Sequence, residues 1–124
     1  MAQKAKDNYR QLIGSWGEDQ AAAYLVKNGC TILQRNYRCP EGEIDIIADD
    51  SGTVIFVEVK TRTNLEFGFP EEAVTDEKLE HIYAATEYYL AEHVDITDWR
   101  IDVLALRGKP GANDLEFVWF KDAG

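Results

Sequence analysis

The feature that most constrains this sequence is a pair of apolar-rich segments separated by a short turn. Residues 43–48 alternate between polar and apolar side chains, and residues 53–60 are rich in Val and Ile. Both patterns are typical of β-strands. Ser51 and Gly52 lie between the segments, and tight two-residue hairpin turns favour glycine. The sequence therefore predicts an antiparallel hairpin. A four-residue loop from Asp49 to Gly52 is the alternative to the two-residue turn, and it would shift the pairing by two residues but keep the same side chains on each face.

One face of this hairpin is predicted to be apolar. With Ser51 and Gly52 as the turn, Ile46 lies opposite Val57 and Ala48 opposite Ile55, and Ile44 and Val59 extend the same face. This surface is suited to packing on a helix. A slip of one residue would turn the whole apolar set outward, so the pattern supports the register.

The other face is predicted to be polar and to carry the chemistry. Asp45 lies opposite Glu58, and Glu43 lies opposite Lys60. Opposed carboxylates are unfavourable unless a cation lies between them or one takes up a proton. Mg²⁺ prefers oxygen ligands and is typically held by one or two carboxylates plus phosphate oxygens. The alternative is an ordinary hairpin with a solvated face and a Glu43–Lys60 ion pair.

Lys60 is the candidate catalytic cation of this group. It lies two residues beyond Glu58 and so beside it. It could orient or deprotonate an attacking water, or neutralise charge that develops on a phosphate. The grouping suits hydrolysis of a phosphodiester with Mg²⁺ or Mn²⁺, and Arg62 on the same face could hold a phosphate.

The rest of the chain predicts an α/β fold. A helix over residues 16–28 with Ser15 as its N-cap is followed by strands over 30–37, 43–48 and 53–60, a loop containing Gly68 and Pro70, a helix capped by Thr75, and strands over 100–106 and 115–120. This order, αβββαββ, suits a central mixed β-sheet flanked by helices. We expect one domain over residues 1–124, in which residues 1–13 can be flexible.

Glu18 and the last strand raise questions of their own. Glu18 precedes Ala21 and Leu25 by three and seven positions, which places it on the helix stripe that faces the sheet. A carboxylate there needs a partner, unless it leans out to solvent at the helix N-terminus.

Residues 117–120 lack polar alternation, so both faces of that strand should be covered, either by a helix of this chain or by a second subunit in a homodimer.

The charge distribution permits a nucleic-acid partner despite a net charge of −10. Residues 1–38 hold six basic and three acidic side chains, and Arg35 and Arg38 lead into the hairpin as the expected phosphate contacts. Nine acids and one base, Lys78, occur over residues 71–98, which indicates a solvated helix face or an acidic surface for a protein partner. No apolar run approaches the ~18 residues of a membrane span, and no secretory signal is present, so we expect a cytoplasmic protein without a membrane partner.

The motifs resemble a known family. Gly42-Glu43-Ile44-Asp45 and Val57-Glu58-Val59-Lys60 look like the signature of the YraN-type family of uncharacterised bacterial proteins, whose Asp and Glu-x-Lys pattern resembles that of restriction-endonuclease-like nucleases. The similarity extends over roughly residues 14–105 and includes Gly17-Glu18, Arg35-Asn36-Tyr37-Arg38, Phe67-Gly68 and Arg100-Ile101-Asp102-Val103.

The resemblance implies a fold and a set of roles. It implies a restriction-endonuclease-like fold in which Asp45 and Glu58 bind the metal with help from the Val59 carbonyl. Lys60 then serves catalysis. Holliday-junction resolvases are similar in placing a glutamate on the first helix, so Glu18 completes the implied site. The fold hosts many chemistries and some inactive members.

Three functions therefore compete. The first is a magnesium-dependent endonuclease acting on DNA, such as branched or damaged DNA. The second is a nucleic-acid-binding module of the same fold with little or no catalysis. The third is an interaction protein that recruits a partner through its acidic helix. Retention of Asp45, Glu58 and Lys60 favours the enzyme over the second function, and the basic N-terminal third favours either of the first two over the third.

Overall fold

The computed structural model describes residues 2–63 and 75–123, with side chains from Asn8 onward. The loop predicted around Gly68 and Pro70 lies outside these residues, as does Phe67. The elements are α1 (Ala2–Lys27), β1 (Thr31–Cys39), β2 (Gly42–Asp50), β3 (Thr53–Arg62), α2 (Asp76–Glu92), β4 (Trp99–Arg107) and β5 (Glu116–Phe120). The predicted order of helices and strands is confirmed.

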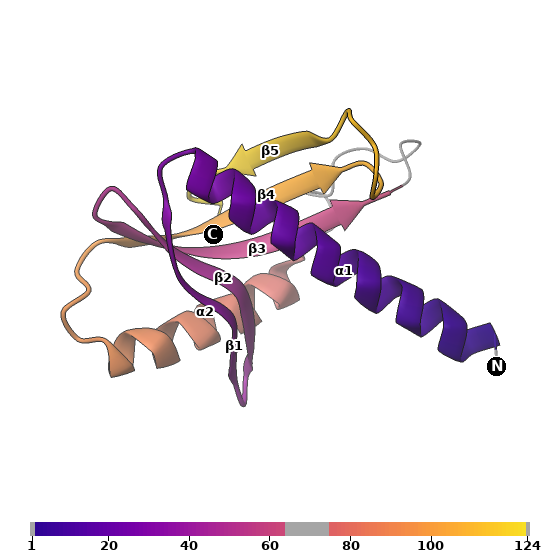
Figure 1. Ribbon diagram of the computed structural model, residues 1–124. Coiled ribbons are helices and arrows are strands. Elements are labelled where there is room, and N and C mark those ends of the chain that lie inside the picture. The colour runs from indigo at the N-terminus through magenta and orange to yellow at the C-terminus, as the bar shows by residue number, and fades with distance from the viewer. Residues whose placement is uncertain (1, 64–74, 124) are drawn as a thin grey trace.

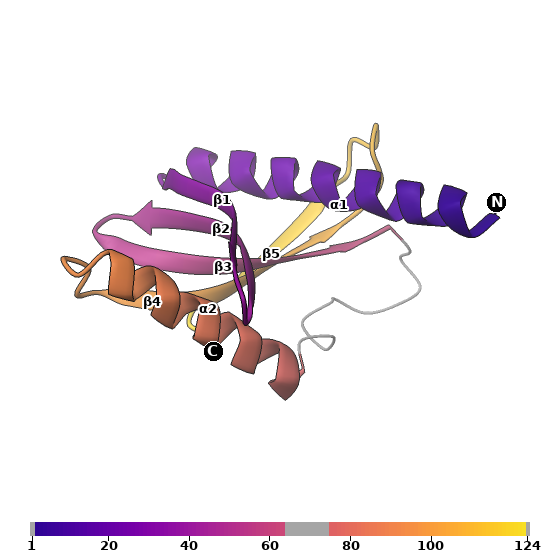
Figure 2. The ribbon, with the colours of Figure 1, turned by 90° about the horizontal axis from the view of Figure 1, so that it is seen from below.

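The five strands form one mixed sheet in the order β1-β2-β3-β4-β5 (Figure 1). Only β3 and β4 pair in parallel, and the other neighbours are antiparallel. The two helices cover opposite faces of the sheet, as Figure 2 shows. The parallel pairing follows from the connection through α2, because a crossover helix carries the chain back to the same end of the sheet.

The predicted register of the central hairpin is confirmed. The pairs of β2 with β3 run from Asp50–Thr53 to Ile46–Val57. Ser51 has φ 53° and Gly52 has φ 100°, so both turn residues are left-handed. This is the conformation of the turns that match the twist of paired strands.

The prediction of one apolar and one polar hairpin face is wrong for most of the hairpin. Ile46, Ala48, Ile55 and Val57 pack under α1 as predicted. The opposite face is also apolar: its buried members, packed with Ile82, Ala85 and Tyr89 of α2, include Ile47, Val54 and Phe56. Ile44 was predicted on the face of Ile46 but belongs to this second cluster, because β2 no longer pairs with β3 beyond Ile46. Central strands between two helical layers are buried on both faces, and their polar alternation is lost.

Helix α1 begins at Ala2, so the predicted start at Trp16 and the predicted N-cap at Ser15 are wrong. The added turns contain the good helix formers Ala, Lys, Gln, Arg and Leu, and they contain no proline. The first half of the helix extends beyond the sheet (Figure 1), and Tyr9 and Leu12 on it are exposed. Neither α1 nor α2, as described, is long and apolar enough to cross a membrane.

The predicted N-cap of α2 is confirmed. Thr75 has extended backbone, and its Oγ1 accepts a hydrogen bond from the Lys78 backbone N–H at 3.2 Å. The cap satisfies one of the free donors of the first turn. Because the cap binds the backbone of Lys78, it also fixes the position from which the Lys78 side chain projects.

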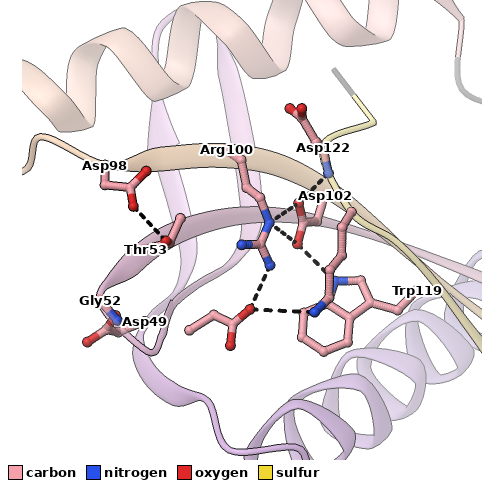
Figure 3. A network of polar contacts seen from close by, with 10 residues as sticks. Asp49, Gly52, Thr53, Asp98, Arg100, Asp102, Trp119 and Asp122 are labelled. Atoms are coloured by element: carbon pink, nitrogen blue, oxygen red, sulfur yellow. Dashed lines mark hydrogen bonds and ion pairs between the residues drawn. The ribbon is translucent and has the colours of Figure 1, made fainter.

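A buried polar network anchors β5 and the residues after it (Figure 3). Asp102 is fully buried and accepts hydrogen bonds from Arg100 Nε at 3.0 Å, Trp119 Nε1 at 2.8 Å and the Asp122 backbone N–H at 2.9 Å. Arg100 also contacts Asp50 at 2.7 Å. Each charged group of the network is paired, which is the condition for burying it.

One face of β5 is covered by a helix of the same chain. The Tyr24 ring of α1 stacks on Phe117, with ring centroids 4.3 Å apart, and meets Trp119 edge-on. The predicted cover of this face of the last strand is therefore a helix of the same chain.

Candidate active site

The candidate site lies where β2 and β3 diverge. Strand β2 pairs with β1 as far as Gly42–Cys39, whereas its pairs with β3 reach only Ile46–Val57. The predicted pairs Asp45–Glu58 and Glu43–Lys60 therefore do not form, because the two strands separate before them. At the point of divergence, Asp45 Oδ2 accepts a hydrogen bond from the Val59 backbone N–H at 2.8 Å. A side-chain carboxylate thus occupies the position of a strand carbonyl, and it is 8% exposed.

Glu58 is the second buried carboxylate and receives two ammonium groups. Its Oε1 lies 3.3 Å from Lys60 Nζ and 3.2 Å from Lys78 Nζ, and the residue is 4% exposed. Lys60 itself is only partly exposed, so it does not lie on an open polar face. The alternative Glu43–Lys60 ion pair does not form, because Glu43 pairs with Arg38 at 3.2 Å.

Lys78 is the member of this group that the sequence analysis missed. The only signal was its position as the single base among nine acids over residues 71–98. The contact joins the first turn of α2 to β3, so only the packing of α2 on the sheet reveals it. Burial by itself would lower the pKa of Lys78, but the charge and hydrogen bond of Glu58 raise it, so the ammonium remains charged.

Asp45 differs from Glu58 in lacking a cation. Among the residues that the structure describes, it makes no ion pair. Burial, followed by the negative charge of Glu58, raises the pKa of Asp45 to about 8, although the hydrogen bond from Val59 opposes the rise. Glu18 and Glu43 add to the same repulsion. Both ammonium groups of the site thus contact Glu58, and the interaction found for Asp45 is the hydrogen bond from Val59.

Glu18 projects from α1 toward the same place. Its Oε2 lies 3.8 Å from Arg35 Nη2, and Arg35 also contacts Asp19 at 2.8 Å. Burial raises the pKa of Glu18, with Arg35 acting in the opposite direction. The helix stripe predicted to face the sheet is thus where the structure places this glutamate.

A cavity of about 470 Å³ opens onto these groups. Its lining includes six predicted site residues: Glu18, Asp45, Glu58, Val59, Lys60 and Arg62. Arg35 and Arg38 are not in the lining. Arg35 is held by Asp19 and Glu18 beside the cavity, and the exposed Arg38 pairs with Glu43. The structure therefore brings together the predicted catalytic group and Arg62, but not the other two arginines.

The donors of this site fit a divalent cation of the magnesium type. No three His, Cys, Asp or Glu side chains within residues 2–63 and 75–123 are grouped closely enough to hold a metal by themselves. Mg²⁺ does not require three, because it usually keeps several waters and takes phosphate oxygens as further ligands. Two buried carboxylates, one of them without a cation, meet that requirement.

Comparison with known proteins identifies the family. Residues 17–106 match the model of the uncharacterised protein family UPF0102. A UPF0102 protein of Beutenbergia cavernae is 45% identical over 117 residues, which cover 93% of this chain and 96% of that protein. Another, of Syntrophotalea carbinolica, is 44% identical and covers 87% and 97%. A third, of Caldicellulosiruptor bescii, is 46% identical and covers 90% and 95%. The chain belongs to the UPF0102 family.

Proposed function

We propose that this protein is a Mg²⁺- or Mn²⁺-dependent endonuclease that hydrolyses phosphodiester bonds of DNA, on a fold of the restriction-endonuclease-like type. The observation that carries the proposal is the buried, cation-free carboxylate of Asp45 beside Glu58 and Lys60 in one cavity. The mixed sheet between two helices and the position of the site at a diverging hairpin are compatible with such a fold.

Asp45 and Glu58 would hold the metal, with the Val59 carbonyl as a further oxygen donor. When bound, Mg²⁺ would neutralise charge on the phosphate and lower the pKa of a bound water. Glu18 lines the same cavity from α1 and would accept a hydrogen bond from a water of the coordination shell. These assignments use groups that the fold already holds in place.

Lys60 would act on the reacting phosphate. Its ammonium is held by Glu58 at the cavity wall, so it can donate to a nonbridging phosphate oxygen. A water oxygen attacks phosphorus and loses a proton to solvent, the phosphorus–oxygen bond to the leaving group breaks, and the leaving alkoxide takes up a proton from solvent. Lys60 stabilises the charge that develops, and Lys78 keeps Glu58 in position from the opposite helix.

The phosphate contacts proposed for the substrate are Arg62, Arg38 and Arg35. Arg62 lines the cavity. Arg38 forms an exposed pair with Glu43, and such pairs are worth only about 0–1 kcal/mol, so its guanidinium can turn to a phosphate. Arg35 would contribute its charge from beside the cavity.

A cleavage assay tests the proposal. Linear, flapped and four-way DNA is incubated with Mg²⁺ or Mn²⁺ and with wild type, Lys60→Ala or the control Lys27→Ala, whose lysine is exposed at the end of α1. We expect Lys60→Ala to lose about 100-fold or more in rate, and Lys27→Ala to cleave as wild type does. Equal rates for wild type and Lys60→Ala would reject this mechanism.

Metal binding is tested separately by calorimetric titration with Mn²⁺. Asp45→Asn should weaken binding, whereas the exposed Asp95→Asn should not. Metal binding that depends on Asp45, together with no cleavage of any substrate, would favour the nucleic-acid-binding module. Equal metal binding by all three proteins would remove the metal from this hairpin.

A further inference from the structure

A second hollow continues the candidate site along α1. It measures about 430 Å³ and is lined by residues of the β4–β5 connection, including Gly108, Lys109 and Ala112. Tyr9 and Thr63 line both this hollow and the cavity that contains Asp45 and Glu58. The two hollows therefore adjoin at Tyr9 and Thr63, beyond the end of β3, and together they are called the groove.

Cationic side chains follow this groove despite the acidic character of the chain. Lys60 and Arg62 of β3 and Arg10 of α1 line the first part together with the three acids of the candidate site, and Lys109 lines the second. Two acids also line the second part. Glu116 is paired with Arg107 at 2.9 Å, and Asp114 is exposed. Outside the candidate site, the groove therefore offers Arg10, Arg62 and Lys109 to a phosphate backbone. Charges farther than about 8 Å from that backbone are largely screened at physiological salt.

Tyr9 provides an aromatic surface at the junction of the two hollows. It is 57% exposed and lies on the half of α1 that extends beyond the sheet (Figure 1). An exposed ring next to a row of cations is the combination that binds single strands, in which bases stack on aromatic rings and the backbone follows the positive charges. Hollows of this volume take a ligand the size of a nucleotide, whereas a paired helix would have to remain outside.

We propose that this groove is a subsite for an unpaired strand of DNA that flanks the cleaved phosphate. The strand runs from Lys60 past Arg62 to Tyr9 and Lys109, with one base stacked on Tyr9. The inference rests on the proposed function for the position of the cleaved phosphate, and it narrows the substrate to DNA with an unpaired arm. It also gives a role to the part of α1 that extends beyond the sheet (Figure 1).

The test measures binding without metal, so that no cleavage occurs. Fluorescence anisotropy compares a labelled short oligothymidylate with a duplex of the same length, in EDTA. Tyr9→Ala should bind the single strand roughly five-fold or more weakly, because stacking of one base is worth about 1–3 kcal/mol. Tyr9→Phe should bind as wild type does. The matched control is Tyr83→Ala, which removes an exposed tyrosine from α2 and should have no effect.

A salt series tests the path of the backbone. Replacing Arg62 or Arg10 with alanine should reduce the slope of log affinity against log salt by about 0.7 for each lost phosphate contact of a single strand. Single-strand binding that is unchanged in Tyr9→Ala, absent in wild type, or no tighter than duplex binding would overturn the subsite.

The two proposals fail in distinguishable ways. Cleavage that depends on Lys60 but is indifferent to Tyr9 would reject the subsite and leave the nuclease. Single-strand binding that depends on Tyr9, without any cleavage, would keep the groove as a binding site and reject the nuclease.

Discussion

At the scale of single residues, the site is defined by an imbalance between two neighbouring carboxylates. Glu58 contacts two ammonium groups, and Asp45 has one backbone hydrogen bond and raised pKa. A buried carboxylate beside a second carboxylate, with no cation in contact with it, costs stability. This cost should therefore be measurable as a dependence of stability on pH.

We predict that Asp45→Asn is more stable than wild type at about pH 8.5 and similar to it at about pH 4. The pKa of Asp45 is about 8 in the folded protein and ordinarily 3.8, so its proton stabilises the fold at low pH and this stability is lost as pH rises between those values. Asn stays neutral and can still accept the Val59 hydrogen bond. The difference should reach the order of a few kcal/mol.

Urea unfolding across this pH range measures the difference. Asp95→Asn, on an exposed residue, is the control and should follow wild type throughout. Added Mg²⁺ should stabilise wild type and not Asp45→Asn. A constant difference between Asp45→Asn and wild type across the range would show that Asp45 is already ionised in the folded protein at low pH.

At the scale of elements, two contacts position the strands that carry the site. Gly17 of α1 lies directly against Thr61 of β3, one residue beyond Lys60, and a Cβ at Gly17 would overlap the Thr61 side chain. At the other end of the sheet, Asp102 of β4 binds Trp119 of β5. The first contact sets the distance between helix and strand at the site, and the second fixes the edge of the sheet.

We predict that Gly17→Ala destabilises the protein although alanine favours a helix. Overpacking typically costs about 1–3 kcal/mol, and the gain in helix propensity returns only about 1 kcal/mol. Gly14→Ala is the control in the same helix, because nothing lies within 4 Å of its added Cβ, and it should be neutral or stabilising. The melting temperatures of both variants and of wild type, measured by thermal unfolding, test this prediction. A Gly17→Ala protein that melts with Gly14→Ala would mean that α1 can move away from β3 at no cost.

We predict that Asp102→Ala costs about 3–5 kcal/mol, because it leaves the guanidinium of Arg100 and two N–H donors without their shared acceptor. Asp122→Asn is the control, since the network uses only the backbone N–H of that residue. Urea unfolding followed by tryptophan fluorescence would report both. A loss below about 1 kcal/mol would mean that water replaces the carboxylate and that β5 is held by its apolar contacts.

At the scale of the whole molecule, the main run of acidic residues and the candidate groove lie in different parts of the fold. The chain carries a net charge of −10, but its acids are concentrated over residues 71–98, much of which belongs to α2, and the candidate groove lies along α1 and the end of β3. The helices lie on opposite faces of the sheet, so the sheet separates them (Figure 2). Local charge therefore governs how a phosphate backbone approaches.

We predict that replacing both Arg35 and Arg38 with alanine weakens duplex DNA binding and reduces its salt slope by up to about two units, or about 0.9 for each phosphate contact. Glu80→Gln with Glu87→Gln, on the exposed side of α2, should change the slope much less. Affinities measured across a salt series give the slopes. A double arginine variant with an unchanged slope would assign the phosphate contacts to the groove alone and would show that Arg35 and Arg38 do not contact phosphates in the complex.

The sequence by itself determined the order of elements, the register of the central hairpin and the joint position of Asp45, Glu58 and Lys60. These follow from local causes: strand alternation with period two, a turn that needs left-handed residues, and the Thr75 cap. Glu18 was also within reach, because a helical stripe shows which residues face the sheet. The early start of α1 was missed because the residues before Tyr9 are mostly polar and Ser15 is a favourable N-cap residue.

The tertiary structure alone decided the environment of these groups. Lys78 reaches Glu58 only because α2 packs on the face of the sheet opposite α1, and both faces of β3 are buried for the same reason. The raised pKa of Asp45, the ion pairs of Arg35 and Arg38, and the groove from Lys60 to Tyr9 all depend on contacts between residues distant in the chain. Periodicity places a side chain on a face of its own element, whereas burial and charge depend on the neighbouring elements that cover that face.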